Sequence, residues 1–180
     1  LCDIMVIEQP LVEEPKLICM SDPALCVAPT VEDLVKVTRN CLPMMGKLGY
    51  ARPRVAYLAA LEVVKEAMPA TVLAAEAAKK INEMVESLDA EGPLSFDIAC
   101  SKRAAEVKGR ETPVAGKADL LIVPNLETGN VLAKTIAVFT KAEYGHLILG
   151  AKVPVVMSSR SDSSLSKFNS ILLGLFCAGA

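Results

Sequence analysis

The sequence has few aromatic residues, little net charge and no long apolar run. Its 180 residues include no tryptophan, three tyrosines and four phenylalanines, so small aliphatic side chains must build most of its core. Nineteen Lys and Arg residues against 21 Asp and Glu residues give a formal net charge of −2, too little for non-specific nucleic-acid binding. Every apolar run ends well before the roughly 20 residues that a membrane helix requires. We therefore expect a soluble, cytoplasmic protein with neither nucleic acid nor a membrane as a partner.

Signatures of metal and redox sites are also scarce. The six cysteines form no CxxC pair and mostly fall in apolar runs, which favours buried free thiols over disulfides. The only histidine, His146, has no Cys or His neighbour with metal-ligand spacing, so we expect no metal site. It precedes an apolar segment and has no partner nearby in the sequence, which predicts a structural or surface role. No cysteine has the setting of a nucleophile, so covalent catalysis is not indicated.

Strand-like and helical segments alternate along the chain, a pattern typical of an α/β domain with a mostly parallel sheet. Thr30 and Asp33 predict a capping box at the first helix. Gly92 and Pro93 are expected to break the chain. Strands are expected over residues 3–8, 16–20, 54–61, 118–123, 147–149 and 153–157. Helices are expected from 30 to 46 or 49, over 70–88 and 98–108, from 129 to about 143, and over a closing helix. The apolar face of that closing helix comprises Leu165, Phe168, Ile171, Leu172 and Leu175.

One candidate site lies where the strand over 118–123 gives way to a helix. Ligands of open α/β sheets collect at the carboxyl ends of strands, where helix N-termini present free N–H groups that favour anions. Here Gly129 permits close backbone approach, Thr128 offers a hydroxyl and Asn130 an amide. The alternative is a structural loop in which Thr128 or Asn130 caps the helix.

A second candidate site is the segment 157–164 (MSSRSDSS), which precedes the closing helix. An arginine among hydroxyl residues suits a phosphate group, because the guanidinium of Arg160 can donate two parallel hydrogen bonds. The alternative is a solvated loop in which Asp162 or Ser163 caps the helix.

Residues 114–130 (VAGKADLLIVPNLETGN) resemble the most characteristic stretch of the phosphate acetyl/butyryltransferase family. The resemblance runs over nearly the whole chain. Within the family, residues 63–71 and 158–163 are more similar to the butyryltransferase branch than to the acetyltransferase branch. Further similar segments are 91–97, 150–155, 159–160, 21–24 and 28–29.

The resemblance implies an architecture like that of isocitrate and isopropylmalate dehydrogenases, with three-layer α/β domains, one inserted into the other. Residues 1–147 would form the inserted domain, and residues 148–180 a C-terminal segment returning to the first domain. The chain starts at Leu1 and enters a strand almost at once, so we expect a longer protein whose N-terminal part is absent here. Family members place the active site in the cleft between the domains, and other arginines that they use would lie in the absent N-terminal part, so the 180-residue chain alone is expected to be inactive.

The resemblance also implies a reaction, acyl-CoA plus phosphate giving acyl phosphate plus coenzyme A, in a ternary complex within a homodimer. The acyl group would be butyryl or another short chain, or acetyl. Coenzyme A would be a co-substrate, with no permanently bound cofactor. Ser159 and Arg160 match the family pair that binds phosphate and stabilises the oxyanion. The family's general base corresponds to Ser166 here, so Asp162 either replaces it or caps the helix. The residues expected to bind substrate or coenzyme A are Asn125, Thr128, Gly129, Asn130 and Lys152.

Two other functions compete with this one. An enzyme of the isocitrate or isopropylmalate dehydrogenase type shares the architecture but needs clustered metal-binding aspartates, which the sequence does not show. A non-catalytic domain of the same fold, which binds acyl-CoA or dimerises, needs no Ser159–Arg160 pair. The presence of that pair favours the acyltransferase.

Overall fold

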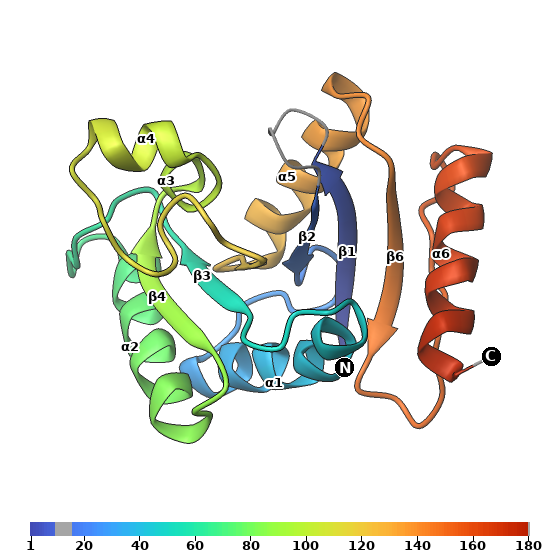
Figure 1. Cartoon of the computed structure of the whole chain (residues 1–180), viewed down its shortest axis with the longest axis horizontal. Helices are drawn as coiled ribbons and strands as arrows, with labels where there is room; N and C mark the ends of the chain where they lie inside the picture. Colours follow the sequence, from blue (N-terminus) through green and yellow to red (C-terminus); the bar gives the residue numbers. More distant parts are fainter. Residues whose placement is uncertain (10–15, 180) are drawn as a thin grey trace.

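A computed structural model of the chain describes residues 1–9 and 16–179 (Figure 1). No helix among these residues is long and apolar enough to span a bilayer. The strands are β1 (Cys2–Gln9), β2 (Lys16–Ser21), β3 (Arg54–Leu58), β4 (Asp89–Leu94), β5 (Leu120–Ile122) and β6 (Tyr144–Leu149). The helices are α1 (Val31–Lys47), α2 (Pro69–Met84), α3 (Phe96–Cys100), α4 (Lys102–Val107), α5 (Leu126–Phe139) and α6 (Ser164–Ala178).

The strands form one mixed sheet in the order β4-β3-β5-β2-β1-β6. The pairs β3–β4, β3–β5 and β2–β5 are parallel, whereas β1 is antiparallel to both β2 and β6. The expected α/β class with a mostly parallel sheet is therefore confirmed. In Figure 1, β6 and α6 stand beside β1 at one end of the sheet.

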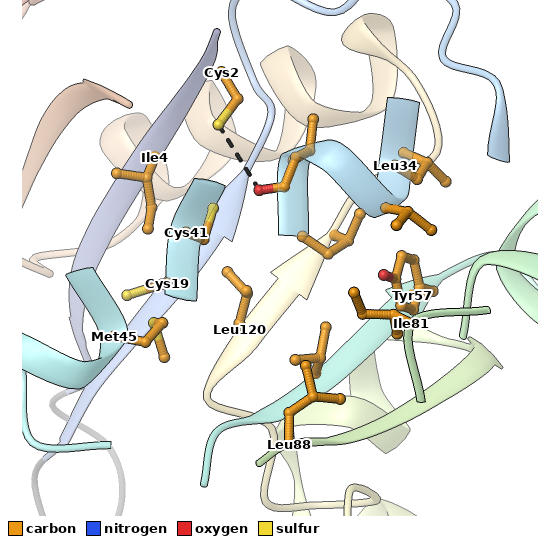
Figure 2. Close-up of a cluster of buried hydrophobic side chains, with 14 of the residues drawn as sticks. Cys2, Ile4, Cys19, Leu34, Cys41, Met45, Tyr57, Ile81, Leu88 and Leu120 are labelled. Atoms are coloured by element: carbon orange, nitrogen blue, oxygen red, sulfur yellow. Dashed lines mark hydrogen bonds between the residues drawn. The ribbon is translucent and has the colours of Figure 1, made fainter. Parts of the chain in front are cut away.

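Helices cover both faces of the sheet, and each face has its own apolar core. On one face, Leu34 and Met45 of α1 and Ile81 of α2 pack against Ile4 and Tyr57 of the strands (Figure 2). On the other face, side chains of α3, α4 and α5 pack against Met5, Met20 and Leu121. All six cysteines are free, as expected; Cys2, Cys19 and Cys41 are buried, while Cys26, Cys100 and Cys177 are partly exposed.

The predicted capping box of α1 is present, because Thr30 accepts a hydrogen bond from the backbone N–H of Asp33 and the Asp33 carboxylate accepts one from that of Thr30. The predicted strands at β1, β2 and β5 are also present. Two elements are shorter than expected: β3 ends at Leu58 rather than at residue 61, and α2 ends at Met84 rather than at residue 88.

The expected break at Gly92 and Pro93 is wrong, because both residues lie inside β4. This strand is at the edge of the sheet, where proline's missing N–H costs little. Glycine is needed at 92 because a Cβ there would lie 2.7 Å from Tyr57 Cβ and 2.8 Å from the Ala74 carbonyl oxygen. The two residues therefore allow close packing on the sheet instead of ending an element.

Two further segments differ from expectation. The helix predicted over 98–108 is two short helices, α3 and α4, which meet at Ser101, the N-cap of α4. The strand predicted over 153–157 is reduced to a single bridge between Ile148 and Val155.

The apolar face predicted for α6 lies on the outer side of the helix, away from β6. Leu165, Phe168 and Ile171 are each about half exposed, whereas Ser166, Ser170 and Gly174 are buried. Helix α6 lies so close to β6 that a Cβ on Gly145 would be 2.9 Å from Leu173 Cδ1 and 3.0 Å from the Asn169 carbonyl carbon. Small residues make this approach possible, and the larger apolar side chains are left on the outer face.

Candidate active site

A cavity of about 360 Å³ lies between α5, the ends of β1 and β6, and the loop that precedes α6. The loop after β2 closes one side with Pro23 and Ala24. Segments from both ends of the chain therefore meet at one place. The polar residues that line the cavity are Asp3, Asn130, Lys134, Tyr144, His146, Ser158, Ser159, Arg160 and Asp162.

Asp162 fixes the loop that carries Ser159 and Arg160. One carboxylate oxygen of Asp162 accepts a hydrogen bond from the backbone N–H of Ser159 at 2.7 Å, and the other accepts one from the Tyr144 hydroxyl at 3.2 Å. Asp162 is buried, and Ser163 rather than Asp162 caps α6 by accepting a hydrogen bond from the backbone of Ser166. Because both of its oxygens are occupied, Asp162 acts here as an anchor for the loop. Burial, together with the nearby Asp162 charge, raises the pKa of Tyr144.

His146 has a partner that the sequence did not suggest. Its Nδ1 lies 2.8 Å from a carboxylate oxygen of Asp3, a residue 143 positions away, and the Asp3 side chain is only 2% exposed. The second oxygen, Asp3 Oδ1, is the single buried side-chain oxygen or nitrogen without a hydrogen bond among the described residues. Burial raises the pKa of Asp3, and the hydrogen bond with His146 offsets only part of this rise. His146 therefore has a side-chain partner that is distant in the sequence.

Arg160 and Lys134 supply positive charge to the cavity. Within residues 1–9 and 16–179, neither cation has a carboxylate within ion-pairing distance, whereas the acids beside them are occupied by Ser159, Tyr144 and His146. The Ser159 hydroxyl is 3.1 Å from that of Ser161. The cavity therefore offers two free cations and hydroxyl donors to an anion.

The junction before α5 only partly joins this cavity. Asn125, not Thr128 or Asn130, caps α5, because its side chain accepts a hydrogen bond from the backbone of Thr128 at 2.9 Å. Asn130 lines the cavity and donates a hydrogen bond to the Pro23 carbonyl at 3.3 Å. Thr128 is exposed and Gly129 is buried, and neither lines the cavity.

Gly129 is needed for α5 to sit against the loop after β2. A Cβ at this position would be 2.8 Å from Val123 Cγ2, 2.9 Å from the Asp22 carbonyl oxygen and 2.9 Å from Pro23 Cα. Gly129→Ala is therefore expected to lower the free energy of unfolding by about 1–3 kcal/mol in urea denaturation. The matched control is Gly46→Ala in α1, where a Cβ meets nothing within 4 Å and should stabilise the helix by about 0.5–1 kcal/mol. Equal effects of the two variants would contradict this account.

Lys152 lies outside the site. It lines another cavity, with Arg39 and Asn40 among its neighbours, and the two cavities share no residue. Of the eight residues predicted for the site, the structure brings together Asn130, Ser159, Arg160 and Asp162. The sequence analysis missed Asp3, Lys134 and Tyr144. No local pattern marks them, because the cavity that they line forms between segments distant in the sequence.

The family of the chain is shown by comparison with known proteins. A family model described as "Phosphate acetyl/butaryl transferase" matches residues 2–175. The chain is 40% identical to a phosphate acetyltransferase of Thermotoga maritima over 161 residues, which are 88% of this chain and 54% of that protein. It is 37% identical to a phosphate butyryltransferase of Clostridium acetobutylicum over 165 residues, 91% of this chain and 55% of that protein.

A solved structure of similar fold is a branched-chain phosphotransacylase from Enterococcus faecalis V583, with a TM-score of 0.90 and 36% identity over 98% of this chain and 62% of that one. The chain thus spans about half the length of the curated relatives that it matches. Since the family model covers nearly all of the described residues and the resemblance holds in both sequence and fold, the chain belongs to the phosphate acetyl/butyryltransferase family.

Proposed function

We propose that the protein is a phosphate acyltransferase, which exchanges a short acyl group between coenzyme A and inorganic phosphate in a ternary complex. The observation that supports this most strongly is the cavity itself, where Arg160, Lys134 and Ser159 meet and neither cation pairs with a carboxylate of the described residues. A tetrahedral dianion needs such cations and donors, and the guanidinium can bind two phosphate oxygens at once. The names of the relatives, phosphate acetyltransferase and phosphate butyryltransferase, indicate the reaction in which this phosphate would take part.

Each residue has a role in this proposal. Arg160 binds phosphate and balances its charge, and the Ser159 hydroxyl donates to the oxyanion that develops on the acyl carbonyl. Asp162 holds both residues in place by accepting the hydrogen bond from the Ser159 backbone. Asn130, at the start of α5, lines the same cavity and is available to coenzyme A. For Asn125, Gly129, Thr128 and Lys152 the cavity offers no contact of this kind.

The arrangement of the whole protein is part of the same proposal. Residues 1–147 would belong to an inserted domain and residues 148–180 to the returning segment of another, in a cytoplasmic homodimer. The outer face of α6 supports the proposal that another domain or subunit packs on it, because Leu165, Phe168, Ile171 and Leu172 are each 45–54% exposed. Apolar side chains gathered on one face of a helix favour a covered surface.

The test is a thiol-release assay on the full-length protein with acetyl-CoA and butyryl-CoA, each with and without phosphate. We expect thiol release that depends on phosphate, and the ratio of the two kcat/KM values then gives the acyl preference. One methylene changes such a ratio by about 10- to 200-fold. Binding of acyl-CoA without phosphate-dependent release would instead support the non-catalytic domain.

A further inference from the structure

The Asp3–His146 pair is placed to move a proton in the cavity. His146 lines the cavity and is 14% exposed at its side chain, while Asp3 beneath it is almost fully buried. The contact of Nδ1 with the Asp3 carboxylate favours the tautomer that donates from Nδ1, and this tautomer has its lone pair on the other ring nitrogen, Nε2. Nε2 has no hydrogen-bond partner in the described part of the chain. Among these residues the only fully buried side-chain oxygen or nitrogen without a partner is Asp3 Oδ1, so Nε2 is accessible to solvent.

His146 has contacts at both its backbone and its ring. The backbone N–H of His146 donates to the Ser170 hydroxyl at 2.9 Å, and this hydroxyl donates to the Ser166 carbonyl at 2.8 Å. The Tyr144 ring meets the imidazole edge to face, with centroids 5.8 Å apart. A buried carboxylate on one ring nitrogen and a free second nitrogen that opens on a cavity form the arrangement of a general base with its orienting acid.

We infer that His146, oriented by Asp3, is the general base that takes the proton of the coenzyme A thiol. The inference deepens the proposed function and rests on it. As the S–H bond breaks, its proton goes to Nε2, and the sulfur electron pair forms the C–S bond to the acyl carbon of the acyl phosphate. The C–O bond to phosphate breaks, its electron pair leaves with the phosphate, and the imidazolium returns the proton to that oxygen. Asp3 is a positioning residue, and Asp162, with both oxygens occupied, remains the loop anchor.

The charges around the imidazole suit this cycle. The Asp3 carboxylate stabilises the imidazolium that forms when the ring takes the thiol proton. The charged and titratable groups around the pair are Asp3 on β1, Asp22 after β2, Lys134 on α5, Tyr144 on β6, and Arg160 and Asp162 in the loop before α6.

The experiment is the pH dependence of kcat/KM for the full-length protein, with acyl phosphate and coenzyme A as substrates. The key variant is His146→Asn, whose amide can still donate to Asp3 but offers no base. We expect an unchanged thermal unfolding midpoint and a loss of kcat of about 100-fold or more. The acidic limb of the pH–rate profile should move to higher pH, toward the pKa of the free thiol. Asp3→Asn should move that limb down, because the imidazolium loses its carboxylate. Added imidazole should restore part of the rate to His146→Gly.

The outcomes separate the two proposals. A wild-type protein without phosphate-dependent thiol release would overturn both. Wild-type activity with an unchanged acidic limb in His146→Asn, no imidazole rescue, and a shifted limb in Asp162→Asn would overturn only the inference, and would make Asp162 the base.

Discussion

Arg160→Ala is expected to lower kcat/KM for phosphate-dependent thiol release by about 100- to 1,000-fold. Arg160 enters the cavity from a loop fixed by Asp162, and no carboxylate of residues 1–9 or 16–179 pairs with it. Its donors are thus free for phosphate, and the alanine variant leaves Lys134 as the only other lysine or arginine among the described residues that line the cavity. The measurement is steady-state thiol release by the full-length protein with phosphate varied.

Two controls make the result specific. Arg160→Lys keeps the charge but lacks the planar fork, so it should retain part of the rate with a raised KM for phosphate. Arg103→Ala removes an exposed arginine from α4, far from the cavity lining, and should leave both constants unchanged. A loss in Arg160→Ala no larger than in Arg103→Ala would argue against the phosphate role.

Asp119→Ala is expected to lower the free energy of unfolding by about 3–5 kcal/mol, because it removes one partner of a buried charge network. Asp119 is 1% exposed and accepts two hydrogen bonds from the Arg54 side chain, both at 2.8 Å, and one from Lys16 at 3.2 Å. The backbone N–H of Arg54 also donates to it at 3.0 Å. Urea denaturation measures the loss. The control is Asp89→Ala, which breaks an exposed pair with Arg52 of similar geometry and should cost about 0–1 kcal/mol. Similar losses in both variants would contradict the burial argument.

The same network predicts an acid limit to stability. Burial acts to raise the pKa of Asp119, but hydrogen bonds from Arg54 and the charge of Lys16 outweigh it, so the pKa lies below its ordinary value of 3.8. A folded carboxyl that binds protons less tightly than the unfolded one stabilises the fold fully above that value, and this stabilisation is lost as pH falls through the folded pKa. Between about pH 5 and about pH 2, the range in which carboxyl groups titrate, the free energy of unfolding of the wild-type protein should therefore fall more than that of Asp119→Asn.

The sequence predicted those parts of the fold that local residues decide. Thr30 and Asp33 are three positions apart, so their capping box could be recognised without tertiary contacts. The apolar run of β5 had no alternative to burial. In contrast, Gly92 and Pro93 are local signals for a break, and only the edge position of β4 beside Tyr57 makes them part of a strand. On α6 the periodicity showed one apolar face, but it could not show that Ser166, Ser170 and Gly174 allow the closer approach to β6.

The candidate site divides in the same way. Ser159, Arg160 and Asp162 are neighbours in one loop, so residue types and spacing were enough to indicate an anion site. Asp3 was not predicted, because its significance depends on His146, from which 143 positions separate it. Lys152 was assigned to the site by resemblance alone. It lies in the loop after β6 and lines another cavity.

The position of β6 at the end of the sheet has a consequence for how activity fails. Among the strands that the structure describes, only β1 pairs with β6 along its length. Tyr144 and His146 lie on β6, and the loop with Arg160 follows it. Edge elements open locally at a lower free energy than central strands. On heating, activity should therefore be lost when β6 and the loop after it detach, before the central strands unfold. Phosphate bound as proposed, between Arg160 and Lys134, would tie this edge of the sheet to α5. Phosphate would then slow the loss of activity on heating more than it raises the unfolding temperature of the central strands, since a ligand stabilises only the form that binds it.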